Sequence, residues 1–218
     1  PHSPMLTSFH IKLLAAILMV IDHIGYVFFP KLLIFRIIGR LSFPLFAWLI
    51  GEGEKHTKDF KWYLIRLIAV GIISQPFYYL LFHLWRPNIL ASLAFGLLAI
   101  RLDKITELKV AFAFLLAGIA QLINAESGAY GVLLIVFISK FEAKSIPWWI
   151  GWMIFNIICV IPLAIDSLEL SYQFFAVLAP LVLLLWKGEH GPRAKWFYAF
   201  YPLHLAILLV IKLILLKT

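Results

Sequence analysis

Two ionisable residues, Asp22 and His23, lie side by side near the middle of an apolar, membrane-length run over residues 13–29. An Asp at the centre of a membrane helix costs roughly 2.5–3.5 kcal/mol on insertion scales, so it needs a partner, a water-filled cavity or a function. One alternative is structural, with the imidazole of His23 bonded to a backbone carbonyl. Because both groups lie together in apolar surroundings, we favour a functional role for the pair.

Lys12 extends this chemistry toward the membrane surface. It precedes His23 by eleven positions, which on an α-helix is about three turns and roughly 16 Å along the axis, so both residues return to nearly the same face. A cation at the membrane edge suits an anionic cofactor headgroup, and the deeper imidazole suits a reactive group on an extended arm. For Lys12 taken alone, the simpler interpretation is a side chain that reaches back to the surface.

The next apolar segment contains Arg36-Ile-Ile-Gly-Arg40-Leu-Ser-Phe-Pro44. We expect Arg40 within the outer half of the membrane, and Pro44 to free a backbone carbonyl one turn earlier. An intramembrane guanidinium needs a carboxylate or a ligand, and Asp22 lies at comparable depth on the antiparallel neighbour. The sequence therefore predicts an ion pair between Asp22 and Arg40, which is either purely structural or also braces a site.

A polar loop follows, in which Gly51-Glu-Gly-Glu-Lys-His56-Thr57 leads on to Arg66. We interpret Thr57 as a helix cap, and the glycines would let backbone approach a phosphate. The lysines of this loop are solvated in the simpler interpretation, whereas Arg66 lies just inside the next apolar segment. His56, Thr57 and Arg66 are thus candidates for binding a phosphate-bearing cofactor.

Polar residues also interrupt later apolar segments. Gln75-Pro76 predicts a kink with a polar side chain facing neighbouring helices, and Tyr201-Pro202 presents a second imidazole, His204, near mid-membrane. The two histidines could bracket a substrate, shuttle a proton or ligate a haem, and their spacing does not choose. Four further polar residues are interpreted first as hydrogen-bonding links between helices: Asn88, Asn124, Asn156 and Tyr130.

The composition sets the class of protein that holds these residues. The chain has 218 residues, of which 63% are hydrophobic and 14% charged, and its mean hydropathy is +0.97. No soluble domain could bury so much apolar surface, so we predict an all-α polytopic transmembrane helix bundle. The net charge of +8 arises from cations at helix ends, which indicates membrane topology and contact with membrane lipids, and we expect no nucleic-acid partner.

Apolar windows predict about nine spans, of which the fourth and sixth are short. Their bounds are 12–29, 33–51, 62–84, 88–101, 109–124, 128–140, 147–165, 170–186 and 196–216. The cations concentrate in the connections after even-numbered spans, which places these connections and the N-terminus in the cytoplasm. They are Lys55, Lys58, Lys61, Arg66, Arg101, Lys104, Lys109, Lys140, Lys144, Lys187, Arg193 and Lys195. The other connections carry fewer: Lys31, Arg36 and Arg86.

The domain organisation is predicted to be simple. We expect Met5 to be the natural initiator, residues 1–4 to be a cloning remnant, and residues 5–218 to form one transmembrane domain. The chain contains no dinucleotide fingerprint, Walker loop, zinc-ligand spacing or serine nucleophile elbow, so we expect no metal and no soluble-enzyme template.

Several of these segments, in order along the chain, together resemble the TraX family. They are Met-Val-Ile-Asp22-His23, Gly39-Arg40-Leu-Ser-Phe-Pro-Leu-Phe46, His56-Thr57 with Tyr63 and Arg66-Leu, Ser-Gln75-Pro76, and Tyr201-Pro-Leu-His204-Leu. The family is named for the F-pilin acetylase of conjugative plasmids, so the resemblance implies acetyl transfer from acetyl-CoA at the bacterial inner membrane. The spacing of Lys12 and His23 is also similar to a signature of the wider acyltransferase-three superfamily of transmembrane acetyltransferases.

This resemblance implies roles for the candidate residues. Acetyl-CoA would enter from the cytoplasm, with its phosphates near Lys12 and the loop from His56 to Arg66, and its thioester would reach His23. His23 would act as general base or transient acetyl carrier, and Asp22 would orient it and raise its basicity. Arg40 would stabilise negative charge on the thioester oxygen, and His204 would be the reserve candidate for the acceptor side.

The acceptor would contact Gln75, Tyr130 and Tyr201. Tyr130 opens a Tyr-Gly-Val-Leu-Leu run that follows Glu126 and Ser127 where the family leads us to expect an Asp, so a pilin amine, a glycan and a lipid all stay open. The main alternative is a proton-coupled transporter with an intramembrane Asp, His and Arg site. A haem protein using both histidines is a third possibility.

Overall fold

The computed structural model describes residues 5–166, 172–192, 194 and 196–215. Regular structure in these residues is helical, apart from one isolated bridge between Leu6 and Trp186. The protein is therefore an all-α helix bundle, as predicted. The chain divides into two compact units, of which the first combines Pro1–Leu49 with Lys140–Ala194 and the second combines Ile50–Ser139 with Lys195–Thr218.

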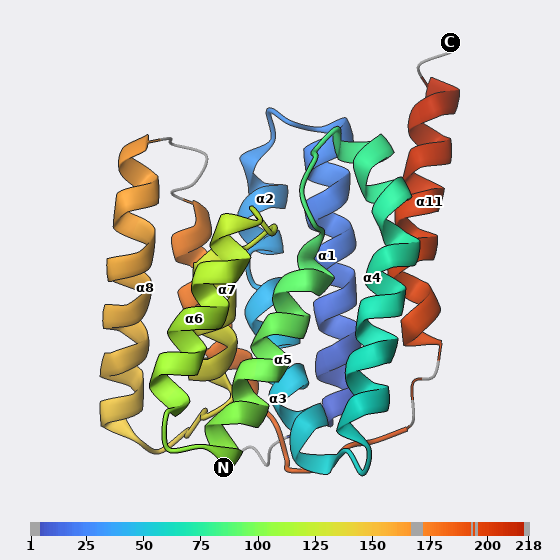
Figure 1. Cartoon of the computed structure of the whole chain (residues 1–218). Helices are drawn as coiled ribbons and strands as arrows, with labels where there is room; N and C mark the ends of the chain where they lie inside the picture. Colours follow the sequence, from blue (N-terminus) through green and yellow to red (C-terminus); the bar gives the residue numbers. More distant parts are fainter. Residues whose placement is uncertain (1–4, 167–171, 193, 195, 216–218) are drawn as a thin grey trace. The chain divides into compact units, whose positions relative to one another are not determined.

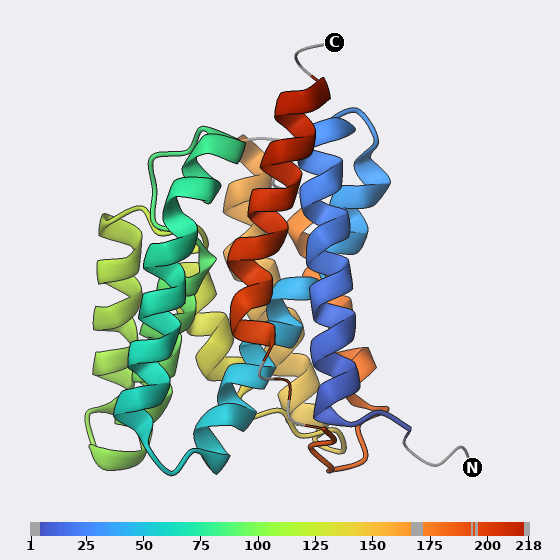
Figure 2. The ribbon, with the colours of Figure 1, turned by 90° about the vertical axis from the view of Figure 1, so that its right-hand side faces the viewer.

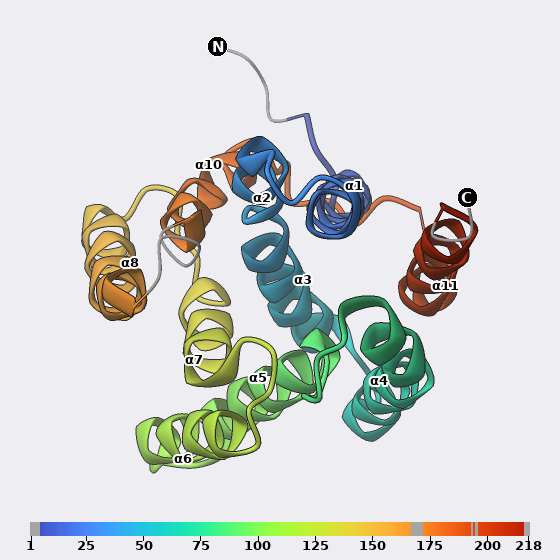
Figure 3. The same cartoon turned by 90° about the horizontal axis from the view of Figure 1, so that it is seen from above.

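The first unit contains α1 and α2, which pack side by side and run in opposite directions (Figure 1). Helix α1 begins after Thr7, whose Oγ1 accepts a hydrogen bond from the backbone N–H of His10 and so satisfies one free donor of the first turn. At the far side of this unit α8 packs against η1 (Figure 3). The elements are α1 (Ser8–Phe28), α2 (Leu33–Gly39), α3 (Ser42–His56, which continues into the second unit), α8 (Ile146–Asp166), η1 (Tyr172–Leu178) and α10 (Pro180–Leu183).

The second predicted span is a broken helix. Helix α2 ends at Gly39 and α3 begins at Ser42, so Pro44 occupies the first turn of α3, where its missing N–H leaves no hydrogen bond unmade. The carbonyl one turn before Pro44 is that of Arg40, which lies in the break itself. The span is therefore interrupted for two residues close to Pro44, and the freed carbonyl stays a prediction.

The second unit contains α4, along which the C-terminal helix α11 runs (Figure 2). Helices α5, α6 and α7 pack against one another through small side chains that include Ala99, Ala117 and Ala120. A Cβ added to Gly96 of α5 would lie 2.4 Å from Cδ1 of Ile135 on α7, so only glycine permits this approach. The elements are α4 (Phe60–Phe82), α5 (Ile89–Ile105), α6 (Lys109–Leu122), α7 (Gly128–Ile138) and α11 (Phe197–Leu215).

All nine predicted spans correspond to helical segments in the described residues. Four helical segments of this part of the chain are long and apolar enough to cross a membrane, if α2 and the following α3 count as one segment: Ser8–Phe28, Leu33–His56, Phe60–Phe82 and Phe197–Leu215. The sixth span is short as predicted, whereas the fourth extends to Ile105. In the eighth, the described residues form a 3-10 helix and the short α10 in place of one continuous α-helix.

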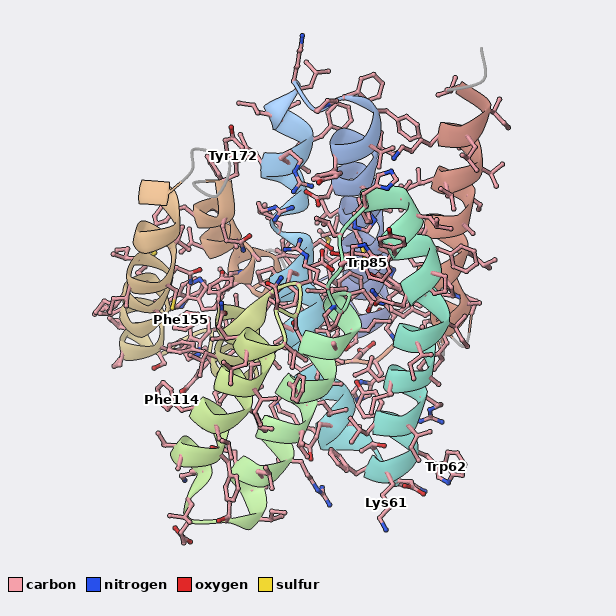
Figure 4. The ribbon with its side chains drawn as sticks, turned by 45° about the horizontal axis from the view of Figure 1, so that its top comes forward. Lys61, Trp62, Trp85, Phe114, Phe155 and Tyr172 are labelled. Carbon is pink, nitrogen blue, oxygen red and sulfur yellow. The ribbon has the colours of Figure 1, made fainter. Side chains whose placement is uncertain are left out.

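Exposed tryptophans lie at both ends of α4. Trp62 in its first turn is 60% exposed, Trp85 just beyond its last turn is 83% exposed, and Lys61 and Trp62 point away from the helix (Figure 4). Tryptophan favours the membrane–water interface. The cytoplasmic placement of the N-terminus stays a prediction, and two cations used for it, Arg193 and Lys195, lie outside the described residues.

Candidate functional site

The Asp22 carboxylate binds two guanidinium groups. Arg40 Nη2 donates to both carboxylate oxygens, at 2.7 Å for Oδ1 and 2.8 Å for Oδ2, and Arg36 Nη1 donates to Oδ2 at 2.6 Å. The predicted pairing of Asp22 with Arg40 is therefore confirmed. Arg36, which we had treated only as a cation of the connecting segment, is a second partner. The arginines are four residues apart and so share one face, a signal that could have revealed the second partner.

Arg40 makes a further contact and carries one buried donor that the carboxylate does not use. Its Nη1 donates to Oε1 of Gln173 in η1 at 3.2 Å. Its Nε is buried and has no hydrogen-bond partner among the described residues. Two guanidinium groups on one carboxylate also give this cluster a formal net charge of +1. Such a cluster favours an anion or a developing negative charge close to it.

Two glycines allow α2 to approach α1 closely enough for these contacts. A Cβ on Gly39 would lie 2.3 Å from both Cβ and Oδ1 of Asp22, and one on Gly25 would lie 2.2 Å from Cβ of Phe35. Both distances are far below van der Waals contact. Gly39 and Arg40 therefore act together, because the glycine makes room for the carboxylate that the arginine binds.

His23 and Lys12 lie on the same uninterrupted helix, α1, so their predicted register on one face is retained. His23 is buried and Lys12 is half-buried. Both oxygens of the neighbouring Asp22 bind guanidinium groups. Asp22 thus positions Arg36 and Arg40, and its predicted role in orienting His23 stays a prediction.

The candidate phosphate loop belongs to the second unit. His56 lies at the end of α3, and its Nε2 is 3.8 Å from Oε2 of Glu52. The predicted cap Thr57 is wrong, because α4 is capped by Asp59, whose carboxylate accepts from the backbone N–H of Trp62 at 3.1 Å. The Thr57 hydroxyl instead donates to the Asp59 carbonyl at 3.2 Å.

Arg66 and a neighbouring carboxylate add further charge to this region. The Arg66 guanidinium is exposed and lies 5.6 Å from the ring centre of Tyr198 on α11, a cation–π contact. Glu54, fully buried, binds Arg101 at 3.2 Å and also Lys104, both from α5. We did not foresee this cluster, because nothing in the sequence relates the end of α3 to that of α5.

Gln75 forms hydrogen bonds to the segment that connects α4 with α5. Its Nε2 donates to the Arg86 carbonyl at 2.8 Å, and its Oε1 accepts from the backbone N–H and Nδ2 of Asn88 at 3.0 and 2.9 Å. Asn88 also donates to the Gly71 carbonyl at 2.8 Å and caps α5. Asn88 is therefore the interhelical link expected. These contacts of Gln75 are structural, and its contact with an acceptor stays a prediction.

The remaining candidates lie on α11 and α7. His204 is buried, and its Nδ1 donates to the Phe200 carbonyl at 3.0 Å, which leaves Nε2 as the basic nitrogen. Its ring meets that of Tyr201 edge to face at 5.3 Å, and the Tyr201 hydroxyl is buried with no hydrogen-bond partner in the described part of the chain. Tyr130 is half-buried near the start of α7.

Asn124 is not a link between helices, since it is exposed and ends α6 in a left-handed conformation with φ 55°. In α8, Nδ2 of Asn156 donates to the Trp152 carbonyl of its own helix at 2.9 Å. Among the described residues, no group of three His, Cys, Asp or Glu side chains could hold a metal ion.

The long apolar helices and the partly buried ion-pair cluster define an all-α polytopic membrane protein with a charged site inside its first unit. The family model described as TraX protein matches residues 8–212. The chain therefore belongs to the TraX family.

Two relatives match nearly the whole chain. The probable fimbrial assembly protein FimC, serogroup H1, of Dichelobacter nodosus is 29% identical, with 96% of this chain and 97% of that protein covered. Protein TraX of Escherichia coli is 30% identical, with 93% of this chain and 86% of that protein covered. An uncharacterized protein of Rickettsia prowazekii is 38% identical over 39% of this chain and 33% of its own length. No solved structure matches the chain significantly.

Proposed function

We propose that this protein is a membrane acetyltransferase that moves an acetyl group from acetyl-CoA to an acceptor at or beyond the bacterial inner membrane. The observation that carries the proposal is the cationic cluster of Arg36, Arg40 and Asp22, together with the buried His23 that follows Asp22 in α1. An acyl transfer develops negative charge on the carbonyl oxygen and needs a base for the acceptor's proton. The cluster supplies the first requirement and His23 the second.

The residues present suit an acyl-thioester substrate. Lys12 lies roughly 16 Å from His23 along α1, so an extended arm whose phosphates bind Lys12 could place its thioester near the imidazole. The buried Nε of Arg40, which has no hydrogen-bond partner among the described residues, is a donor suited to a developing oxyanion. The name of the Dichelobacter relative refers to fimbrial assembly, which supports a fimbrial subunit amine as one acceptor beside a glycan or a lipid.

The proposed chemistry assigns one task to each group. His23 takes the proton of the acceptor's amine or hydroxyl as that group attacks the carbonyl carbon. Arg40, held by Asp22, stabilises the oxyanion. The carbon–sulfur bond then breaks and His23 returns the proton to the departing thiolate, so that an acetylated acceptor and a free thiol form.

The test is acetyl-CoA turnover by the purified protein in lipid nanodiscs, measured as thiol release, with acetylated products identified by mass spectrometry. We expect His23→Ala to lower kcat by about 10²–10⁴-fold, as loss of a general base does, and Lys12→Gln to raise KM with little change in kcat. His190→Ala is the matched control because His190 is exposed. Unchanged turnover in His23→Ala would remove His23 from the mechanism.

Binding separates the enzyme from the transporter. Saturable acetyl-CoA binding to wild type is expected, weakened in Lys12→Gln. Substrate flux in proteoliposomes without any acetyl-CoA binding would replace the acetyltransferase by the transporter alternative.

A further inference from the structure

An apolar groove of about 610 Å³ runs between α4 and α5 in the second unit. Its walls are formed by Leu64, Ile68 and Ile72 on α4 and by Ala91, Ala94 and Leu98 on α5. Ile68 and Ile72 are 44% and 69% exposed. From Leu64 to Gln75 the groove follows α4 for roughly 16 Å. Its size is that of sites for small ligands, which span about 300–1,000 Å³.

One end of this groove is polar. Arg86, Gln75 and Asn88 line it there. Arg86 is held on two sides, because its Nε donates to the Tyr78 hydroxyl at 3.1 Å and its carbonyl accepts from Gln75 at 2.8 Å. Asn88 fixes the same connection to the Gly71 carbonyl at 2.8 Å. The connection therefore presents a guanidinium at a set position at the end of an apolar channel.

The same end lies at the height of the membrane interface. Trp85 lines it and is 83% exposed, and its ring packs against that of Tyr79 at an angle of 46° with ring centres 4.1 Å apart. An exposed tryptophan at the end of a spanning helix marks the headgroup region. Arg86 also lies on a connection that the cation distribution predicts to be non-cytoplasmic, where arginine is disfavoured. The positive charge at this end of the groove therefore coincides with the region where lipid headgroups lie.

We infer that this groove binds one anionic phospholipid, with the headgroup phosphate on Arg86 and one acyl chain along the walls of α4 and α5. The groove has a cationic end at the interface and apolar walls along the rest of its length. An anionic phospholipid has the matching parts, a negatively charged headgroup and apolar acyl chains. Guanidinium binds phosphate through paired, charge-assisted hydrogen bonds. This inference does not depend on acetyl transfer, and its failure would leave the proposed function unaffected.

Native mass spectrometry of the full chain in detergent tests the inference by titration with palmitoyl-oleoyl phosphatidylglycerol. Palmitoyl-oleoyl glycerol, which has the same chains without phosphate, is the comparison lipid. We expect one phosphatidylglycerol to bind, Arg86→Gln to weaken it about tenfold as expected for one charge-assisted contact, and Arg86→Lys to weaken it less. Excess inorganic phosphate should not displace the lipid, because the acyl chain supplies part of the affinity.

A second variant tests the groove with Arg86 intact. Ala91→Trp should fill the groove and abolish binding of phosphatidylglycerol, whereas Leu203→Trp, on a 57% exposed position of α11, should not. Equal binding by wild type and Ala91→Trp, or by the phosphate-free lipid and phosphatidylglycerol, would overturn the inference. So would a photo-crosslinker at position 94 that captures a polypeptide in cells in place of a lipid.

Discussion

Arg36 and Asp22 form an ion pair with 2.6 Å between Nη1 and Oδ2, across the packed faces of α1 and α2. Arg40 binds the same carboxylate from the next turn. Removing the carboxylate would leave two guanidinium groups without the counter-charge that both of them bind. Asp22 therefore determines whether α2 can stay packed on α1.

Asp22→Asn should lower the free energy of unfolding by about 3 kcal/mol, because breaking a buried ion pair leaves uncompensated charge. Thermal unfolding of the detergent-purified variant measures this loss. Glu142→Gln removes an exposed carboxylate in the same unit and should change stability by no more than about 0.5 kcal/mol. An Asp22→Asn variant as stable as wild type would show that the cluster does not stabilise the fold.

Gly39→Ala should displace Asp22 from both arginines, because the added Cβ would lie 2.3 Å from Cβ and Oδ1 of Asp22. We expect a loss of about 2–3 kcal/mol from overpacking and the weakened ion pairs, and lower acetyl-CoA turnover. Gly118→Ala in α6 is the matched control, because no atom lies within 4 Å of its added Cβ. That control should stabilise the protein by up to about 1 kcal/mol, as alanine replaces glycine in a helix.

Glu54→Gln should loosen the link between the end of α3 and α5, because it removes the charge that Arg101 and Lys104 share. Glu54 is fully buried while its partners are nearly half-exposed, so we expect a moderate loss of about 1–3 kcal/mol. Hydrogen exchange should rise at the ends of both helices. Glu107→Gln, at an exposed position beyond α5, should leave that exchange unchanged.

Asn88→Ala should cost about 2 kcal/mol, because it removes the cap of α5 and the bonds to Gly71 and Gln75. Gln75→Ala disrupts the same network. The double variant should therefore lose less stability than the sum of the single losses. Additive losses in thermal unfolding would mean that the two amides act independently.

Part of the site was predictable because an ionisable residue inside a membrane segment needs a partner of opposite charge. An Asp and an Arg at comparable depth on successive antiparallel spans have little choice but to pair, so Asp22 with Arg40 followed from position alone. The second partner, Arg36, was equally accessible from its four-residue spacing to Arg40. The cap at Asp59 was missed because Thr57 and Asp59 are both good caps, and only the actual start of α4 separates them.

The sequence by itself determined the membrane class, the helical segments and the family. The lengths of the apolar segments and the order of the motifs are visible along the sequence without any knowledge of distances in space. The tertiary structure alone decided which helices approach closely. Glycine at position 39 admits a carboxylate, Glu54 reaches two cations of α5, and the groove beside Arg86 is apolar on both walls. These features depend on distances between segments far apart along the chain, and no local pattern encodes them.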